Sequence, residues 1–290
     1  MDLPIVLAAG AWRTEIAPDL GGSITALTRA EEPVLRARPS PRGADEAACH
    51  PLVPYANRIA GARFSFAGVA HRLAPTPPEA HALHGVGWRR SWRTVSASPR
   101  RCEIALEHRP DGAAAAEWPF GFDARQLFEL DDDGLTASLR VENVGRCDAP
   151  AGIGLHAFFP RRPGERLAFA SAGAWMNGPD LIPAHPTAGD AWDFAAGRAL
   201  GETDIDNDFV GWRGVFRLWA PGGGETVVRA DPVFGVLRCY APRGRDFLAV
   251  EPVSHRANAI NAPGEADAMT RLAPGETLAG SVRFERAGDG

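Results

Sequence analysis

Apolar and polar residues alternate with a period of two along most of the chain, and this pattern constrains the fold more than any other feature. Such a period is typical of a β-strand with one face buried. The 290 positions also include 32 glycines and 25 prolines, which inside a helix cost roughly 1 and 3 kcal/mol each. The sequence therefore predicts an all-β protein and argues against a mostly helical one.

Turn residues divide this pattern into pairs of strands. Residues 123–130 and 135–143 flank an Asp-Gly turn, which is the strongest short-range signal of a β-hairpin. Frequent turn signals of this kind are typical of a sandwich or a barrel. Further strands or hairpins are predicted at residues 63–73, 214–230, 245–251 and 277–285.

The pattern continues without a linker, an internal repeat or a low-complexity tract, so we expect one β-sandwich domain over residues 1–290. Weak helical character is confined to residues 44–50 and 113–118, and both windows are too short to form stable helices alone. Hydrophobic residues make up 45% of the chain and charged residues 23%, as in an ordinary globular protein that can bury a large core.

Charge and hydropathy exclude several classes of protein. The formal net charge is −5, and the basic residues, all arginine, are interspersed with acids, which argues against a nucleic-acid partner. No run of about 18 apolar residues is present, so no membrane span is expected. The apolar first strand lacks the basic start of a signal peptide. Four widely spaced cysteines without a CxxC pair predict reduced thiols in a cytoplasmic protein, rather than a zinc site or a disulfide framework.

Common cofactor and nucleophile motifs are missing from the sequence. It contains no P-loop, no GxSxG and no HExxH, and the βαβ context of a dinucleotide site is lacking. We therefore expect neither a cofactor nor a metal ion.

Two segments in the first third of the chain place polar side chains among apolar or small residues. Asn57 and Arg58 stand just before a predicted strand, and arginine offers a rigid fork of donors to an oxygen-rich ligand. His84 lies between small and aromatic residues, with Trp92 nearby. Histidine moves protons near neutral pH, and aromatic faces pack against the C–H surfaces of sugars. Each segment taken alone is also compatible with a structural role.

Three later segments have the same character. His156 is the one imidazole in the apolar run 152–160, where burial opposes its charged form and poises it to exchange a proton. Asp206 and Asp208 belong to an acidic cluster before Phe209, which indicates a hydroxyl-binding loop or a solvated turn and lacks EF-hand spacing. Glu251 ends a predicted strand and is a candidate general base if burial raises its pKa.

In this order the five segments resemble the aldose 1-epimerase (galactose mutarotase) family. The resemblance covers residues 12 to 285 and rests on the stretches PYANRIAGARFSFAG, HALHGVGWRRSW, GIGLHAFFP, DIDNDFVGW, VEPVSHRANAIN and RLAPGETL. It implies a large antiparallel β-sandwich. It also implies an isomerase that interconverts the α and β anomers of a free aldohexose without a cofactor, with the sugar as its partner and a monomeric or homodimeric state.

The resemblance also implies a role for each candidate residue. Glu251 matches the general base at the C1 hydroxyl, and His156 matches the general acid at the ring oxygen. His84 would hydrogen-bond the sugar and assist its polarisation. The remaining candidates would bind or position the sugar: Arg58, Asp206 (or Asp208, two residues further on), Asn57 as a support for Arg58, and Trp92.

Two departures from the family pattern indicate a divergent bacterial branch and leave the substrate open. His156 is followed by Ala-Phe-Phe-Pro, and Gly85 by Val-Gly-Trp. A hexose 6-phosphate is a second possible substrate, for which Arg89, Arg90 and Arg93 lie near the site motif. The sequence is also compatible with a catalytically inactive sugar-binding protein or with a purely structural sandwich.

Overall fold

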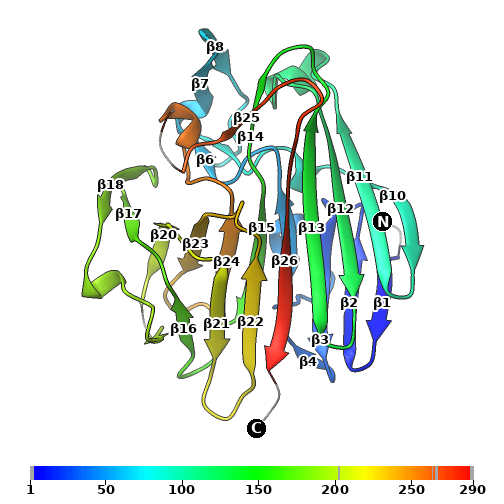
Figure 1. Ribbon diagram of the computed structural model, residues 1–290, viewed down its shortest axis with the longest axis vertical. Helices are drawn as coiled ribbons and strands as arrows, with labels where there is room; N and C mark the ends of the chain where they lie inside the picture. The colour runs from blue at the N-terminus through cyan, green and yellow to red at the C-terminus, as the bar shows by residue number, and fades with distance from the viewer. Residues whose placement is uncertain (1–2, 202, 263, 265–266, 288–290) are drawn as a thin grey trace.

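The computed structural model describes residues 3–201, 203–262, 264 and 267–287. Two large antiparallel sheets, of 11 and 9 strands, stack against each other (Figure 1). This confirms the predicted all-β class and the antiparallel sandwich. No helix in the described part of the chain is long and apolar enough to cross a membrane.

The larger sheet contains both early and late segments of the chain. Its strands are, in spatial order, β1 (Ile5–Ala9), β2 (Trp12–Ala17), β3 (Ser23–Arg29), β5 (Cys49–Leu52), β15 (Gly154–Pro160), β24 (Phe247–Val253), β23 (Val236–Ala241), β20 (Ile205–Val210), β17 (Gly173–Asn177) and β18 (Pro183–Thr187), with β4 (Glu32–Pro33) paired to β3.

The smaller sheet covers one face of the larger one. Its strands are, in spatial order, β10 (Arg93–Ser98), β11 (Arg101–His108), β12 (Phe122–Leu130), β13 (Gly134–Asn143), β26 (Thr277–Ala287), β22 (Glu225–Ala230), β21 (Val215–Trp219), β16 (Arg166–Phe169) and β19 (Arg198–Ala199).

Three two-stranded sheets and six short 3-10 turns complete the described structure. The small sheets pair β6 (Arg58–Ile59) with β9 (Ala82–Leu83), β7 (Arg63–Phe66) with β8 (Val69–Arg72), and β14 (Ala149–Ala151) with β25 (Thr270–Leu272). The turns are η1 (Ala44–Glu46), η2 (Ala60–Ala62), η3 (Gly87–Arg89), η4 (Gly112–Ala116), η5 (Asp190–Trp192) and η6 (Ala259–Asn261).

The hairpins predicted from turn chemistry are present. β12 and β13 pair in register with Leu130 opposite Leu135, on either side of the Asp-Gly turn. The backbone N–H groups of Asp133 and Gly134 donate to the Asp131 carboxylate, which stabilises that turn. The two weakly helical windows form only the 3-10 turns η1 and η4, and residues 49 and 50 belong to a strand instead. Short windows without a packed apolar face do not nucleate α-helices.

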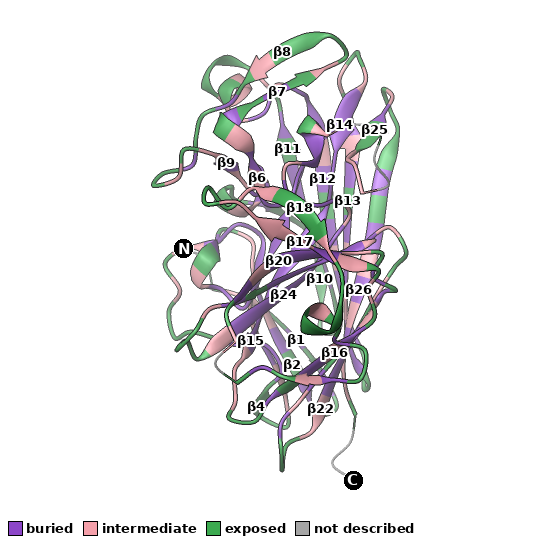
Figure 2. Cartoon of the chain, turned by 90° about the vertical axis from the view of Figure 1, so that its left-hand side faces the viewer, coloured by how far each residue is buried: buried purple, intermediate pink, exposed green. Residues whose placement is uncertain are grey.

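The core lies between the two sheets, where the alternating residues of both converge (Figure 2). In β12 every second residue, from Phe122 to Leu130, is buried, as the period of two requires. The core cluster includes residues from Leu7 to Phe284, so segments from both ends of the chain share it. The extent of the domain, one unit over residues 1–290, stays a prediction.

The adjacent strands β5, β15 and β24 at the centre of the larger sheet are buried on both faces. Leu155, Ala157 and Phe159 join the core between the sheets. The intervening side chains of β15 therefore point to the opposite face of the larger sheet, which loops cover. That covered outer face carries four of the polar residues that the sequence singled out, His156, Asp206, Asp208 and Glu251.

Candidate active site

The strands β15, β24, β23 and β20 lie side by side in the larger sheet (Figure 1), with β5 next to β15. A row of polar side chains crosses these five strands on the outer face of the sheet. His50 is opposite His156 in register, Arg238 is opposite Glu251, and Asp208 is opposite Arg238. Between β15 and β24, His156 Nε2 lies 3.3 Å from Glu251 Oε1. His156 and Glu251, two of the predicted site residues, are thus in direct contact although they are 95 positions apart in the sequence.

Three imidazoles pack together at one end of this row. The ring of His50 stacks on that of His156, with centroids 4.6 Å apart, and His84 meets His156 edge-on at 5.3 Å. The indole of Trp88 stacks on the other side of His50, at 5.6 Å. His50 was not among the predicted site residues, although it shares the signal that found His156, an imidazole in an apolar strand.

Burial keeps these imidazoles neutral near pH 7. It lowers the pKa of His50 to about 4, and the carbonyl of Ala44 only partly offsets this. Burial, with a smaller contribution from neighbouring positive charge, also lowers the pKa values of His84 and His156 well below their ordinary value. A proton delivered by His156 must therefore come from a close partner rather than from a resting imidazolium.

Glu251 is that partner, because burial raises the pKa of its carboxyl to about 8. The positive charge of Arg238 opposes this rise, and Asp206 and Asp208 add to it. Within the described structure, Glu251 Oε2 has no hydrogen-bond partner. Near neutral pH, His156 and Glu251 together therefore hold one exchangeable proton, and they titrate as a pair.

The loop that carries His84 fixes which ring nitrogen faces a ligand. The backbone N–H of Asn57 donates to His84 Nδ1 over 3.1 Å, and the N–H of His84 donates to the Asn57 carbonyl over 2.9 Å. Both residues adopt left-handed backbone, with φ of 58° and 60°. Because Nδ1 accepts, the proton of the neutral ring lies on Nε2, which is left as a donor.

Gly85 allows this loop to approach the sheet closely. Its φ is +68°, and an added Cβ would lie 2.3 Å from the carbonyl oxygen of Val53. We expect Gly85→Ala to reduce both stability and activity, because the clash displaces His84. Gly68→Ala is the matched control, since Gly68 has φ of +79° and open space around it. The control should cost only the left-handed strain of about 1–2 kcal/mol in urea unfolding, with activity retained. Equal effects of both substitutions would contradict this role of the loop.

Arg58 lies beside the cluster and is held by Glu79, an acid that was not among the predicted site residues. Its Nε and Nη2 donate to the two carboxylate oxygens of Glu79, over 2.8 and 2.7 Å. The Asn57 side-chain oxygen accepts from the backbone N–H of Arg58 over 2.8 Å. The charge of Arg58 lowers the pKa values of both Glu251 and His84, so it acts on two members of this cluster. Glu79 lies in a proline-rich loop that carried no functional signal.

The structure distinguishes the two aspartates of the acidic cluster. The Asp208 side chain is 1% exposed, and its oxygens accept from Arg238 Nη1 (3.1 Å) and from the backbone N–H of Ala257 (2.8 Å). The Asp206 side chain also accepts from Arg238 but is 28% exposed. Asp206 is therefore the aspartate that a ligand can reach, and Asp208 is internal.

Trp92 is not brought to the cluster. Its side chain belongs to the core, is 3% exposed and donates from Nε1 to the carbonyl of Gly87 over 3.0 Å. The tryptophan beside the imidazoles is Trp88, in η3. Trp92 is therefore buried in the core rather than placed beside the imidazoles, where Trp88 lies instead.

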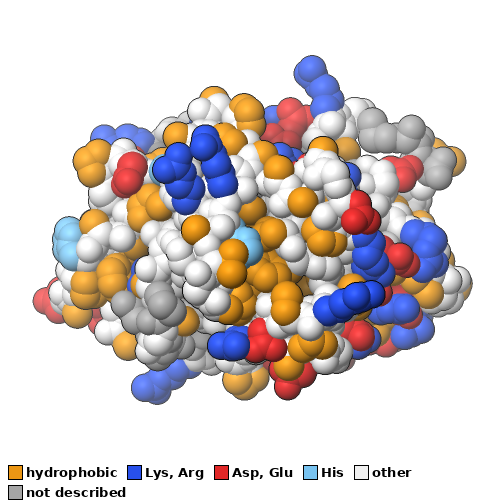
Figure 3. Space-filling view, turned by 90° about the horizontal axis from the view of Figure 1, so that it is seen from above, with side chains coloured by type: hydrophobic (Ala, Val, Ile, Leu, Met, Phe, Trp, Pro, Cys, Tyr) orange, Lys and Arg blue, Asp and Glu red, His pale blue; other side chains and the backbone are white. Residues whose placement is uncertain are grey.

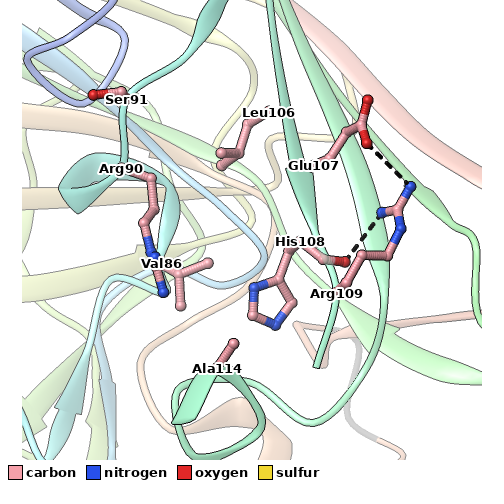
Figure 4. A pocket seen from close by; sticks show the side chains of 8 residues that line it. All are labelled: Val86, Arg90, Ser91, Leu106, Glu107, His108, Arg109 and Ala114. Carbon is pink, nitrogen blue, oxygen red and sulfur yellow. Dashed lines mark hydrogen bonds and ion pairs between the residues drawn. The ribbon is translucent and has the colours of Figure 1, made fainter. Parts of the chain in front are cut away.

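A separate cavity of about 370 Å³ lies near the same loop, between Val86 and His108 (Figure 4). Its charged groups are already partnered: Arg90 binds Glu117, Arg109 binds Asp123, and His108 Nε2 donates to the carbonyl of Trp118.

On the face of the molecule shown in Figure 3, basic and acidic side chains are interspersed. In the described part of the chain, no group of three or more His, Cys, Asp or Glu side chains is arranged to hold a metal ion.

Comparison with known proteins places this chain in a family. The family model for aldose 1-epimerase matches residues 5–285. YphB, an uncharacterized protein of Escherichia coli K12, is 31% identical over 297 positions, which cover 96% of this chain and 98% of YphB. The chain therefore belongs to the aldose 1-epimerase family.

Solved structures agree with this assignment. A crystal structure of a candidate aldose 1-epimerase from E. coli K12 matches with a TM-score of 0.89 and 28% identity, over 98% of both chains. A galactose mutarotase-like protein from Clostridium acetobutylicum has a TM-score of 0.87 at 16% identity, over 98% of this chain and 95% of that one. The second likeness supports the fold alone.

Proposed function

We propose that this protein is an aldose 1-epimerase that interconverts the α and β anomers of a free aldohexose. The observation that carries the proposal is the contact of 3.3 Å between His156 Nε2 and Glu251 Oε1 inside a buried cluster. The reaction needs a group that removes a proton and a group that supplies one, close to the same carbon. These two side chains offer that combination.

The proposed reaction runs through ring opening. The Glu251 carboxylate takes the proton from the C1 hydroxyl while protonated His156 gives a proton to the ring oxygen, and the bond between C1 and the ring oxygen breaks. The C1–C2 bond rotates in the open-chain aldehyde. Closure with the proton transfers reversed yields the other anomer. Each general acid or base of this kind contributes about 10²–10⁴-fold.

The single proton of the resting pair is sufficient for this cycle. It resides mainly on Glu251, since burial raises the pKa of that carboxyl and lowers that of His156. Its transfer to His156 produces the productive carboxylate and imidazolium together. Because the C1 hydroxyl oxygen and the ring oxygen are bonded to the same carbon, one sugar can present both atoms to two groups that lie this close.

The other residues of the site supply binding and polarisation. His84 Nε2–H would donate to a sugar oxygen, and the partly exposed Asp206 would accept from a hydroxyl. Arg58, fixed by Glu79, would hold further sugar oxygens. Trp88 would pack against the apolar face of the ring. These roles fit a site in which a few polar groups orient one small ligand.

The proposal is tested by polarimetry of freshly dissolved α-glucose, α-galactose and further aldoses, with and without the protein. We expect the approach to anomeric equilibrium to accelerate for at least one free aldohexose. Sugar binding detected by calorimetry with no acceleration for any sugar of the panel would instead support an inactive sugar-binding protein.

A hexose 6-phosphate is the second candidate substrate, and Arg89 is the residue that favours it. Arg89 is exposed and lies over the Trp88 ring, with its guanidinium carbon 5.6 Å from the centroid, whereas Arg90 is paired with Glu117. If the substrate is a free sugar, Arg89→Ala should change kcat/KM similarly for glucose and glucose 6-phosphate. A selective tenfold loss in kcat/KM for the phosphate, about 1.4 kcal/mol of transition-state stabilisation, would support the phosphorylated substrate.

A further inference from the structure

Arg238 lies at the centre of three carboxyl groups on the outer face of the larger sheet. It is opposite Glu251 on β24 and opposite Asp208 on β20, and its guanidinium also binds Asp206. The three strands are adjacent (Figure 1). The Arg238 side chain is 2% exposed, and both of its terminal nitrogens donate to aspartate oxygens, so we assign it a role through these carboxyl groups.

The position of this guanidinium is fixed from several sides. Nη1 donates to Asp208 Oδ1 over 3.1 Å, and Nη2 donates to Asp206 Oδ1. Asp208 is itself anchored, because its Oδ2 accepts from the backbone N–H of Ala257 over 2.8 Å. The more exposed Asp206 thus depends on Arg238 for its orientation, and Arg238 depends on Asp208.

We propose that Arg238 is a positioning residue, which orients Asp206 toward the sugar and keeps Glu251 ionisable in its exchange with His156. The kinetic part of this inference rests on the proposed epimerase function. Three carboxyl groups around a single cation cannot all ionise in a buried cluster once the cation is removed. Without Arg238 the proton would stay on Glu251, and the base would be lost.

Other groups that act on Glu251 do not replace this charge. His156 and the thiols of Cys49 and Cys239 are held neutral near pH 7 by burial, which lowers the pKa of the imidazole and raises those of the thiols. Arg58 is positive, but its guanidinium is engaged by Glu79. In the described part of the chain, the titratable and charged groups that contact Glu251 or interact with it electrostatically include His156, Arg238, Asp206, Asp208, Arg58, Cys49 and Cys239.

The first test compares Arg238→Met with Asp208→Asn in pH profiles of mutarotation. Loss of the positive charge should move the pH optimum upward by about one unit or more, the usual size of the effect of a nearby charge. Loss of the Asp208 charge should move the optimum downward. If Arg238 and Asp208 only stabilised the fold, both variants would lose activity without opposite shifts, and that result would overturn the proposal.

Arg238→Lys separates charge from orientation. Lysine retains the positive charge but lacks the fork that reaches two carboxylates at once. We expect a pH optimum within about half a unit of the wild type, since the nearby charge that sets it is kept, together with a raised KM, since Asp206 loses its fixed orientation. A pH optimum for Arg238→Lys that matches Arg238→Met would contradict the role of the charge.

A direct titration keeps this inference independent of catalysis. The side-chain carboxyl of Glu251 can be followed by carbon NMR of glutamate-labelled protein, with its signal identified by its loss in Glu251→Gln. Its midpoint should rise in Arg238→Met and fall in Asp208→Asn, even if the wild type proves inactive on every sugar. An unchanged midpoint in both variants, with native circular dichroism, would refute the inference. If Arg238→Met fails to fold, Asp208→Asn and Arg238→Lys still decide the outcome.

Discussion

Glu251→Gln should reduce mutarotation to the spontaneous rate while leaving the fold intact. Glutamine has nearly the same shape, but its amide cannot accept the proton of the C1 hydroxyl. In the proposed mechanism Glu251 also holds the resting proton that His156 delivers, so the substitution should remove base and acid function together. We therefore expect a loss at or beyond the upper end of the 10²–10⁴-fold range for one general base. Polarimetry of α-galactose and α-glucose measures it directly.

Glu165→Gln provides the matched control. Glu165 is also buried, and burial raises its pKa, but its carboxylate accepts from the backbone N–H of Arg162 and lies outside the active-site row. The control should retain the wild-type turnover. If Glu251→Gln were as active as this control, Glu251 would not be the base.

The substitution Glu251→Gln should also change how the free energy of unfolding depends on pH. The pKa of Glu251 is about 8 in the folded chain against 4.5 ordinarily, so the folded protein binds this proton more tightly than the unfolded chain. The stability contributed by the group is complete below pH 4.5 and is lost as the pH rises through about 8. In thermal melts, the Tm of Glu251→Gln should therefore rise relative to that of the wild type as the pH increases from 5 to 9.

Local patterns in the sequence predicted the fold well. The hairpin of β12 and β13 follows from two alternating runs around an Asp-Gly turn, and both signals act over a few residues. The order of strands in the larger sheet is different, because β5 and β15 pair across about 100 residues of chain. The pairing of these two strands depends on tertiary packing, and the periodicity of a single sequence does not predict which strands pair.

The candidate site was predictable where a side chain contrasts with its own neighbours. His156 and Glu251 each stand out in an apolar strand. Arg238 belongs to such a strand too, but its function arises from cross-strand register, which sets it opposite both Glu251 and Asp208. Asp206 and Asp208 share one face of β20, and register distinguishes them, because Asp208 is opposite the buried Arg238 whereas Asp206 is opposite the exposed Tyr240.

His156→Asn should reduce kcat by about 10²-fold, or about 2.7 kcal/mol in the barrier, because asparagine cannot carry a proton to the ring oxygen. The stacked neighbour His50 provides the control, since its ring packs on His156 but has no contact with Glu251 among the ion pairs of the described residues. His50→Phe keeps an aromatic ring in that stack and should retain most of the turnover.

Polarimetry at the pH optimum of each variant separates the two histidines. A near-wild-type rate for His156→Asn would remove His156 as the acid. Equal losses in both variants would assign the effect to packing of the imidazole cluster. A loss confined to His156→Asn would instead follow from its position, since His156 is the imidazole within 3.3 Å of the carboxyl group that holds the resting proton.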